Sequence, residues 1–232
     1  MNKLNTPPTR SHMKTAILFI IIYITVQLAP AVVVFLFFEP SQVEQILPVT
    51  IITTIISFFI GTAAILTVNY KAQFKTVVDR KGQAFSKIII WGVLGLFLLL
   101  IGQTLASFVE VNFLNQPLTS ENTNQLLTIA RHYPYFILII AFLGPIMEEF
   151  VFRKAIYGSL VPITGKIGAA VIAALIFSFM HLDGHILLYS VTSFIFTYLY
   201  EKTHSIWTPV IAHILLNSLA VLGTFTTVFI SL

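Results

Sequence analysis

Residues 15–38 read TAILFIIIYITVQLAPAVVVFLFF and contain no charged side chain. A helix needs about 20 mostly apolar residues to cross the hydrocarbon core of a bilayer, so this stretch predicts a transmembrane helix. The small residues Ala29 and Ala31 loosely resemble the cleavage site of a secretory signal peptide. Because the apolar run continues through Phe38, a retained span is the better interpretation.

The rest of the chain has the same apolar character. Hydrophobic residues make up 57% of the 232 positions and charged residues only 9%, whereas soluble domains are about one quarter charged. This composition excludes an ordinary soluble domain and a disordered chain, and the absence of cysteine excludes a disulfide scaffold and thiolate catalysis. The expected fold is all-α, a polytopic transmembrane helix bundle of about seven spans, at residues 15–38, 48–68, 88–109, 133–160, 166–182, 185–200 and 206–230.

Basic residues fall in alternate loops, and cationic loops stay on the cytoplasmic side of a membrane. The side predicted to be cytoplasmic carries Lys3, Arg10, Lys14, Lys71, Lys75, Arg80, Lys81, Lys87, Lys166 and Lys202. The opposite side, which includes a polar loop expected at residues 110–132, carries only Arg131 against Glu39, Glu44, Glu110, Glu121 and Asp183. We therefore expect the N-terminus on the cytoplasmic side. The expected location of the protein is the plasma membrane of a prokaryote. We interpret the net charge of +4 as information about membrane topology, and we expect no nucleic-acid partner.

Ionisable groups inside spans are costly and are functional candidates by default. Three short clusters, all in the C-terminal half, hold nearly all of them. In the first, Glu149 and Arg153 are four residues apart and share one helical face, which predicts a buried ion pair that supports the structure. Glu148 points to a different face, so it remains available for chemistry.

The second and third clusters each place a histidine one helical turn from a partner. Phe177 precedes His181 by four residues, and His213 precedes Asn217 by the same spacing. We expect a helix hairpin that turns near residues 162–165, and this turn brings the three clusters to similar depths. Taken alone, each cluster has a plain alternative: an interfacial helix end with solvated charges for the first, a packing or interfacial histidine for the second, and polar contacts between helices for the third.

Two carboxylates, two histidines and an amide inside a membrane suit hydrolysis. A Glu or His can deprotonate water, while His and Asn can stabilise the oxyanion formed when water attacks a carbonyl group. Glu148, His181 and His213 also form a possible ligand set for a divalent metal such as zinc, with room for a water molecule. The residues alone do not decide between metal-bound and metal-free water. His185 completes an HxxxH pattern with His181, but Asp183 and Gly184 between them favour a helix end.

In order, the clusters read EExxxR, FxxxH and HxxxN, and this set resembles the CAAX-protease and bacteriocin-processing family of intramembrane proteases, also called the Abi family. The resemblance covers roughly residues 134–222. It implies that Glu148 and His181 activate the water and that His213 and Asn217 form the oxyanion site. Family members have been described as metalloproteases, but the cofactor stays open because metal dependence is disputed.

The resemblance divides the chain into an N-terminal three-span region, residues 1–132, and a catalytic helix bundle, residues 133–232. It implies an intramembrane endopeptidase, with membrane lipid and a membrane-associated peptide or protein as partners. A non-enzymatic membrane protein, such as a bacteriocin immunity factor or a scaffold, is the alternative, and a proton-coupled transporter is a more distant one. Whether a correctly folded protein needs Glu148 and His181 for its activity discriminates between these functions.

Overall fold

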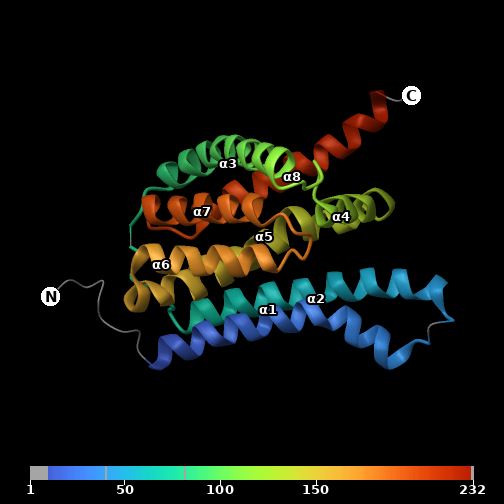
Figure 1. Cartoon of the computed structure of the whole chain (residues 1–232). Coiled ribbons are helices and arrows are strands. Elements are labelled where there is room, and N and C mark those ends of the chain that lie inside the picture. The colour runs from blue at the N-terminus through green and yellow to red at the C-terminus, as the bar shows by residue number, and fades with distance from the viewer. Residues whose placement is uncertain (1–9, 40, 81, 231–232) are drawn as a thin grey trace.

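The computed structural model describes residues 10–39, 41–80 and 82–230, and these residues form helices and connecting segments without a strand. This confirms the all-α class (Figure 1). The elements are α1 (Arg10–Phe37), α2 (Val43–Lys71), α3 (Phe85–Phe113), α4 (Glu121–His132), η2 (Pro134–Phe136), η3 (Ile139–Leu143), α5 (Gly144–Glu148), η4 (Glu149–Tyr157), α6 (Gly158–Phe179), α7 (Ile186–Thr203) and α8 (Trp207–Ile230). Of these, η2 is a 3-10 helix, and η3 and η4 are π-helices.

Four described helical stretches are long and apolar enough to cross a membrane: Arg10–Phe37, Glu44–Lys71, Phe85–Phe113 and Pro134–Phe179. The first three match the first three predicted spans. The fourth is 46 residues long and joins the fourth and fifth predicted spans. It folds back at Gly165, whose φ of 73° lies in the left-handed region that glycine adopts most readily. The hairpin turn therefore lies within residues 162–165, as the sequence predicted.

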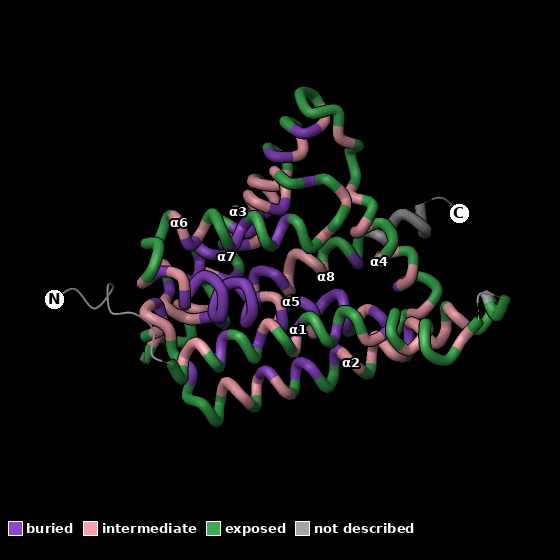
Figure 2. The backbone as a smooth tube through the Cα atoms, turned by 60° about the horizontal axis from the view of Figure 1, so that its bottom comes forward, coloured by how far each residue is buried: buried purple, intermediate pink, exposed green. Residues whose placement is uncertain are grey.

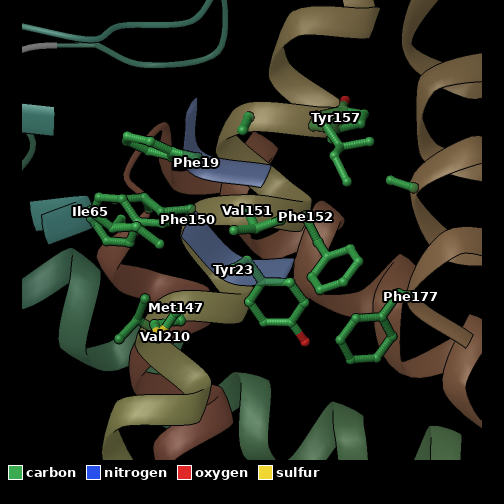
Figure 3. Packing of buried hydrophobic residues seen from close by; sticks show 14 of the residues in the cluster. Phe19, Tyr23, Ile65, Met147, Phe150, Val151, Phe152, Tyr157, Phe177 and Val210 are labelled. Atoms are coloured by element: carbon green, nitrogen blue, oxygen red, sulfur yellow. The ribbon is translucent and has the colours of Figure 1, made fainter. Parts of the chain in front are cut away.

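The helices pack in two groups around the central hairpin (Figure 1). Helices α1 and α2 lie side by side and contact η4 and α5, while α3 packs against α7 and α8. Between these groups, the rings of Tyr23, Phe152 and Phe177 form a continuous aromatic core (Figure 3). Figure 2 shows that buried positions gather near α5, whereas the outer faces of α1, α2 and α3 are largely exposed. These exposed apolar faces are the surfaces that lipid covers in an integral membrane protein.

Residues 110–132 were expected to form an external loop, and this expectation is wrong for most of the segment. Helix α3 continues to Phe113, and α4 covers residues 121–132. The hydroxyl of Ser120 accepts a hydrogen bond from the N–H of Thr123 at 3.0 Å and so caps α4. Glu121 in the first turn and Arg131 in the last complement the helix dipole. These local signals outweigh the polar composition that suggested a loop.

The cytoplasmic position of the N-terminus stays a prediction. Of the basic residues that support it, Lys3 and Lys81 lie outside the described residues. Because the chain has no cysteine of its own, single introduced cysteines can test it. In intact cells, we expect a membrane-impermeant maleimide to leave Gln83→Cys unlabelled and to label Leu118→Cys, whose side chain is 74% exposed. The reverse labelling pattern would invert the topology.

Candidate active site

The structure brings the three polar clusters to one cavity of about 610 Å³. Glu148 ends α5, His181 follows α6, and α8 carries His213. Asn217, one turn further along α8, also lines this cavity. Helices α4 and α7 supply much of the remaining wall. The cavity therefore joins side chains that come from three separate parts of the chain.

Glu149 holds two partners in the protein interior. Its Oε2 lies 3.1 Å from Nε of Arg153, the ion pair predicted from the four-residue spacing, and both side chains are fully buried. Its Oε1 lies 2.8 Å from Nδ1 of His213. Local spacing does not predict this second contact, because 64 residues separate Glu149 from His213. A carboxylate only accepts, so the His213 proton belongs on Nδ1, and this bond fixes the orientation of the ring.

The two adjacent glutamates lie in different surroundings. The side chain of Glu148 is 20% exposed, and its Oε2 lies 3.8 Å from Nε2 of His213. Glu149, by contrast, begins the nine-residue π-helix η4 and is completely buried. π-Helical turns occur frequently at functional sites because they re-aim side chains. Here the change of helix type occurs between the two carboxylates, and it leaves Glu148 on the cavity.

Aromatic rings enclose the guanidinium group of Arg153. The carbon Cζ lies 4.5 Å from the ring centre of Phe177 and 4.8 Å from that of Phe196. Among the described residues, none of the three guanidinium nitrogens of Arg153 has a hydrogen-bond partner, so its contact with Glu149 is an ion pair without hydrogen-bond geometry. Cation–π attraction, which strengthens in a desolvated environment, therefore supplements the ion pair with Glu149. Phe177 also packs edge-on against His181, with ring centres 4.7 Å apart, and so links the ion pair to the second cluster.

A hydrogen bond and a stacked aromatic ring hold the imidazole of His181 in place. Its Nδ1 lies 2.8 Å from the carbonyl oxygen of Phe177. Since a carbonyl oxygen only accepts, Nδ1 carries the proton and Nε2 is the nitrogen left for chemistry. The ring of Tyr189 stacks on the imidazole with centres 3.7 Å apart. Tyr189 was not predicted as a site residue, because no local spacing connects it to His181.

Hydrogen bonds fix Tyr189 in turn. Its hydroxyl donates to Oδ2 of Asp183 at 3.1 Å and lies 2.8 Å from the hydroxyl of Ser120, which also bonds Asp183 at 2.5 Å. Burial alone would raise the pKa of Asp183, but the hydrogen bonds from Ser120, the N–H of His185 and Tyr189 hold this pKa below its usual value. The ionised Asp183 therefore joins α4, α7 and the turn that carries His181.

Asn217 contacts the helix that precedes α5. Its Nδ2 donates to the carbonyl oxygen of Ile140 in η3 at 2.9 Å. A side-chain amide nitrogen carries two protons, so one N–H of Asn217 remains for another acceptor. This contact ties α8 to the hairpin and sets the side chain at the cavity wall.

A second cavity of about 160 Å³ shares six lining residues with the first, and Glu148, His181 and Asn217 are among them. Its far side is α1, from which Tyr23 and Gln27 line the space. Nε2 of Gln27 donates to the hydroxyl of Tyr23 at 3.0 Å. Helix α1 was not predicted to reach the site, although a polar Gln27 inside an apolar span was a usable signal. Glu148, His181 and Asn217 thus lie between the large cavity and a smaller space beside the N-terminal helices.

The predicted metal ligands Glu148, His181 and His213 line the same cavity. Among residues 10–39, 41–80 and 82–230, no group of three or more His, Asp or Glu side chains is placed to hold a metal ion. In His213, Nδ1 is engaged by Glu149, and Nε2 lies 3.8 Å from Glu148. In His181, Nδ1 faces a backbone carbonyl group. Because these contacts leave Nε2 of both imidazoles available, as is usual for metal-bound histidines, a metal held by Glu148, His181 and His213 stays a prediction.

His185 belongs to a separate buried pair. Its Nδ1 lies 2.7 Å from Oε2 of Glu110, a residue that the sequence analysis placed in an external loop. Oε1 of Glu110 accepts hydrogen bonds from the backbone N–H groups of Leu187 and Leu188 at 2.8 and 3.0 Å. A carboxylate at a helix N-terminus satisfies unpaired donors and complements the helix dipole. The pair anchors the start of α7 to the end of α3 and explains why both residues are buried.

The chain is similar in sequence to known membrane peptidases. Residues 130–219 match the family model described as type II CAAX prenyl endopeptidase Rce1-like, and this range includes all three polar clusters. The candidate membrane peptidase YdiL of Bacillus subtilis is 30% identical over 88% of this chain and 86% of its own. The membrane-embedded CAAX protease MroQ of Staphylococcus aureus is 32% identical over 89% of this chain and 87% of its own. No solved structure matches.

Proposed function

The chain belongs to the CAAX protease family of membrane-embedded peptidases, and from this membership we propose that Glu148 and His181 activate the water that cleaves a peptide bond. The observation that carries the proposal is the position of Glu148. It is the carboxylate that lines the cavity with His181, while its neighbour Glu149 is engaged by Arg153 and His213. The substrate proposed is a peptide or protein at the membrane.

In the proposed reaction, Glu148 takes a proton from water as the water oxygen attacks the peptide carbonyl carbon. The carbonyl double bond becomes a single bond to a negatively charged oxygen. When this tetrahedral intermediate collapses, the bond from carbon to nitrogen breaks, and the protonated Glu148 returns its proton to the leaving amine. The Nε2 of His181, left unprotonated by the bond at Nδ1, accepts a hydrogen bond from the water and orients it.

His213 and Asn217 are proposed to stabilise the negatively charged oxygen. In the proposed step His213 acts as the imidazolium, with Nδ1 held by Glu149 and the N–H at Nε2 donating toward the cavity. The second N–H of Asn217, which the contact to Ile140 leaves over, is the other donor. Donors that are already fixed before the reaction lower its barrier because they need no reorganisation, and low polarity around them strengthens the effect.

Asn217→Ala tests this assignment. Loss of one oxyanion donor typically reduces turnover by about 10² to 10³, so the variant should be slow but measurable on a membrane peptide substrate. Its KM should change little, since the contact acts mainly in the transition state. Asn217→Asp is the matched variant, because it keeps the size but replaces the donor by an acceptor. Wild-type turnover in both variants would remove Asn217 from the mechanism.

A further inference from the structure

A separate cavity of about 280 Å³ lies at the end of the bundle where α2 ends and α8 begins. Its walls come from Tyr70 at the end of α2, the segment that follows it, Lys154 of η4 and Trp207 at the start of α8. None of its lining residues lines either cavity of the candidate active site. The cavity, called the basic pocket below, is thus independent of the catalytic proposal.

Positive charge is in excess in the basic pocket. Lys75, Arg80 and Lys154 line it, and Asp79 is the only carboxylate lining it in the described part of the chain. The carboxylate of Asp79 is also committed to its own loop, where Oδ2 accepts a hydrogen bond from the N–H of Thr76 at 3.0 Å. Three cations facing one shared carboxylate favour an additional anion.

Lys154 is the most buried of these cations, with a side chain only 7% exposed. Its Nζ donates to Oδ1 of Asn69 at 2.8 Å and lies 3.7 Å from Oδ2 of Asp79. A buried ammonium group is costly unless it is closely paired, and a separation of 3.7 Å leaves this pair loose. An anion in the basic pocket would reduce that cost.

The rim of the basic pocket is held in place before any ligand binds. The N–H of Arg80 donates to the carbonyl oxygen of His204 at 3.2 Å, and Nδ1 of His204 lies 3.0 Å from the carbonyl oxygen of Val78. These contacts fix the segment after α2 against the turn between α7 and α8. Fixed groups lose less conformational entropy when a ligand binds.

The location of the basic pocket indicates which anion reaches it. It opens at the end of α2, a helix apolar enough to span a membrane. The side chains of Tyr70 and Trp207 are 76% and 45% exposed there, and Tyr and Trp concentrate at the level of lipid headgroups. Basic pockets between transmembrane helices bind anionic headgroups. We propose that the basic pocket binds the phosphate group of an anionic phospholipid.

The test uses the full chain, reconstituted in nanodiscs that contain phosphatidylcholine and phosphatidylglycerol. Native mass spectrometry measures which lipid remains bound after release from the disc. Wild-type protein should retain phosphatidylglycerol preferentially, and Lys75→Gln/Arg80→Gln should lose about 25-fold of this preference, at about fivefold for each basic residue. The matched control Lys14→Gln/Lys87→Gln removes the same charge outside the basic pocket and should keep the wild-type preference.

Three results would overturn the proposal. The first is an unchanged lipid preference in the double variant, and the second is an equal loss in the control. The third is a gain in melting temperature with inorganic phosphate that equals the gain with phosphatidylglycerol, which would make free phosphate the ligand. Melting temperatures in phosphatidylcholine alone verify that both double variants fold. If Lys75→Gln/Arg80→Gln does not fold, the single variant Arg80→Gln replaces it, with an expected loss of about fivefold.

Discussion

Glu148→Gln is expected to reduce the turnover of a membrane peptide by about 10² to 10⁴, the usual contribution of a general base. Gln keeps the shape of the side chain but cannot take a proton from water. The fold should be unaffected, because Glu148 lies on the cavity and makes no bond to Arg153 in the described structure. The measurement is initial rate against substrate concentration, with the melting temperature of each preparation taken in the same lipid.

Glu44→Gln is the matched control for this variant. Glu44 lies in the first turn of α2, is exposed, and lines none of the three cavities. It should retain wild-type activity. Wild-type turnover in Glu148→Gln, with the substrate and the membrane unchanged, would remove Glu148 as the base and leave His181 as the candidate.

Arg153→Ala is expected to lower the free energy of unfolding by about 3–5 kcal/mol, because it leaves the buried Glu149 without its cation. The loss should appear as a lower melting temperature in detergent. Arg153→Lys keeps the charge but cannot reproduce the planar packing between Phe177 and Phe196, so it should restore stability only in part.

The contact between Glu149 and His213 adds a second expectation for Arg153→Ala. Without the cation, Glu149 is less firmly fixed, and the orientation of His213 should suffer with it. A variant that loses activity at an unchanged melting temperature would contradict the structural role of Arg153 and give it a direct part in the reaction.

The sequence predicted the membrane fold well because composition and span length decide it. The three N-terminal spans and the hairpin turn at Gly165 follow from apolar runs and from one glycine between them. The ion pair of Glu149 and Arg153 could also be predicted, because residues four apart lie close together in both α- and π-helical geometry. Oε2 of Glu149 lies 3.1 Å from Nε of Arg153. Local patterns are sufficient where the interacting residues are one turn apart.

Contacts between distant parts of the chain could not be predicted from local sequence patterns. Nothing in the sequence near His213 identifies Glu149 as its partner. Nothing near His181 identifies Tyr189 as the ring that stacks on it, or Ser120 as the partner of Tyr189. These contacts depend on how the helices are rotated about their axes. The π-helix η4 changes that rotation for every residue after Glu148, and sequence periodicity does not reveal it.

The central claim is that this membrane peptidase hydrolyses peptide bonds through Glu148. The most direct test compares the peptides in membranes of cells that express the wild-type chain or Glu148→Gln at equal protein levels. We expect a set of cleaved peptides that accumulates with the wild-type chain and disappears with Glu148→Gln. Identical peptides in both membranes, with both proteins folded, would contradict the claim and favour a non-enzymatic role such as immunity or scaffolding.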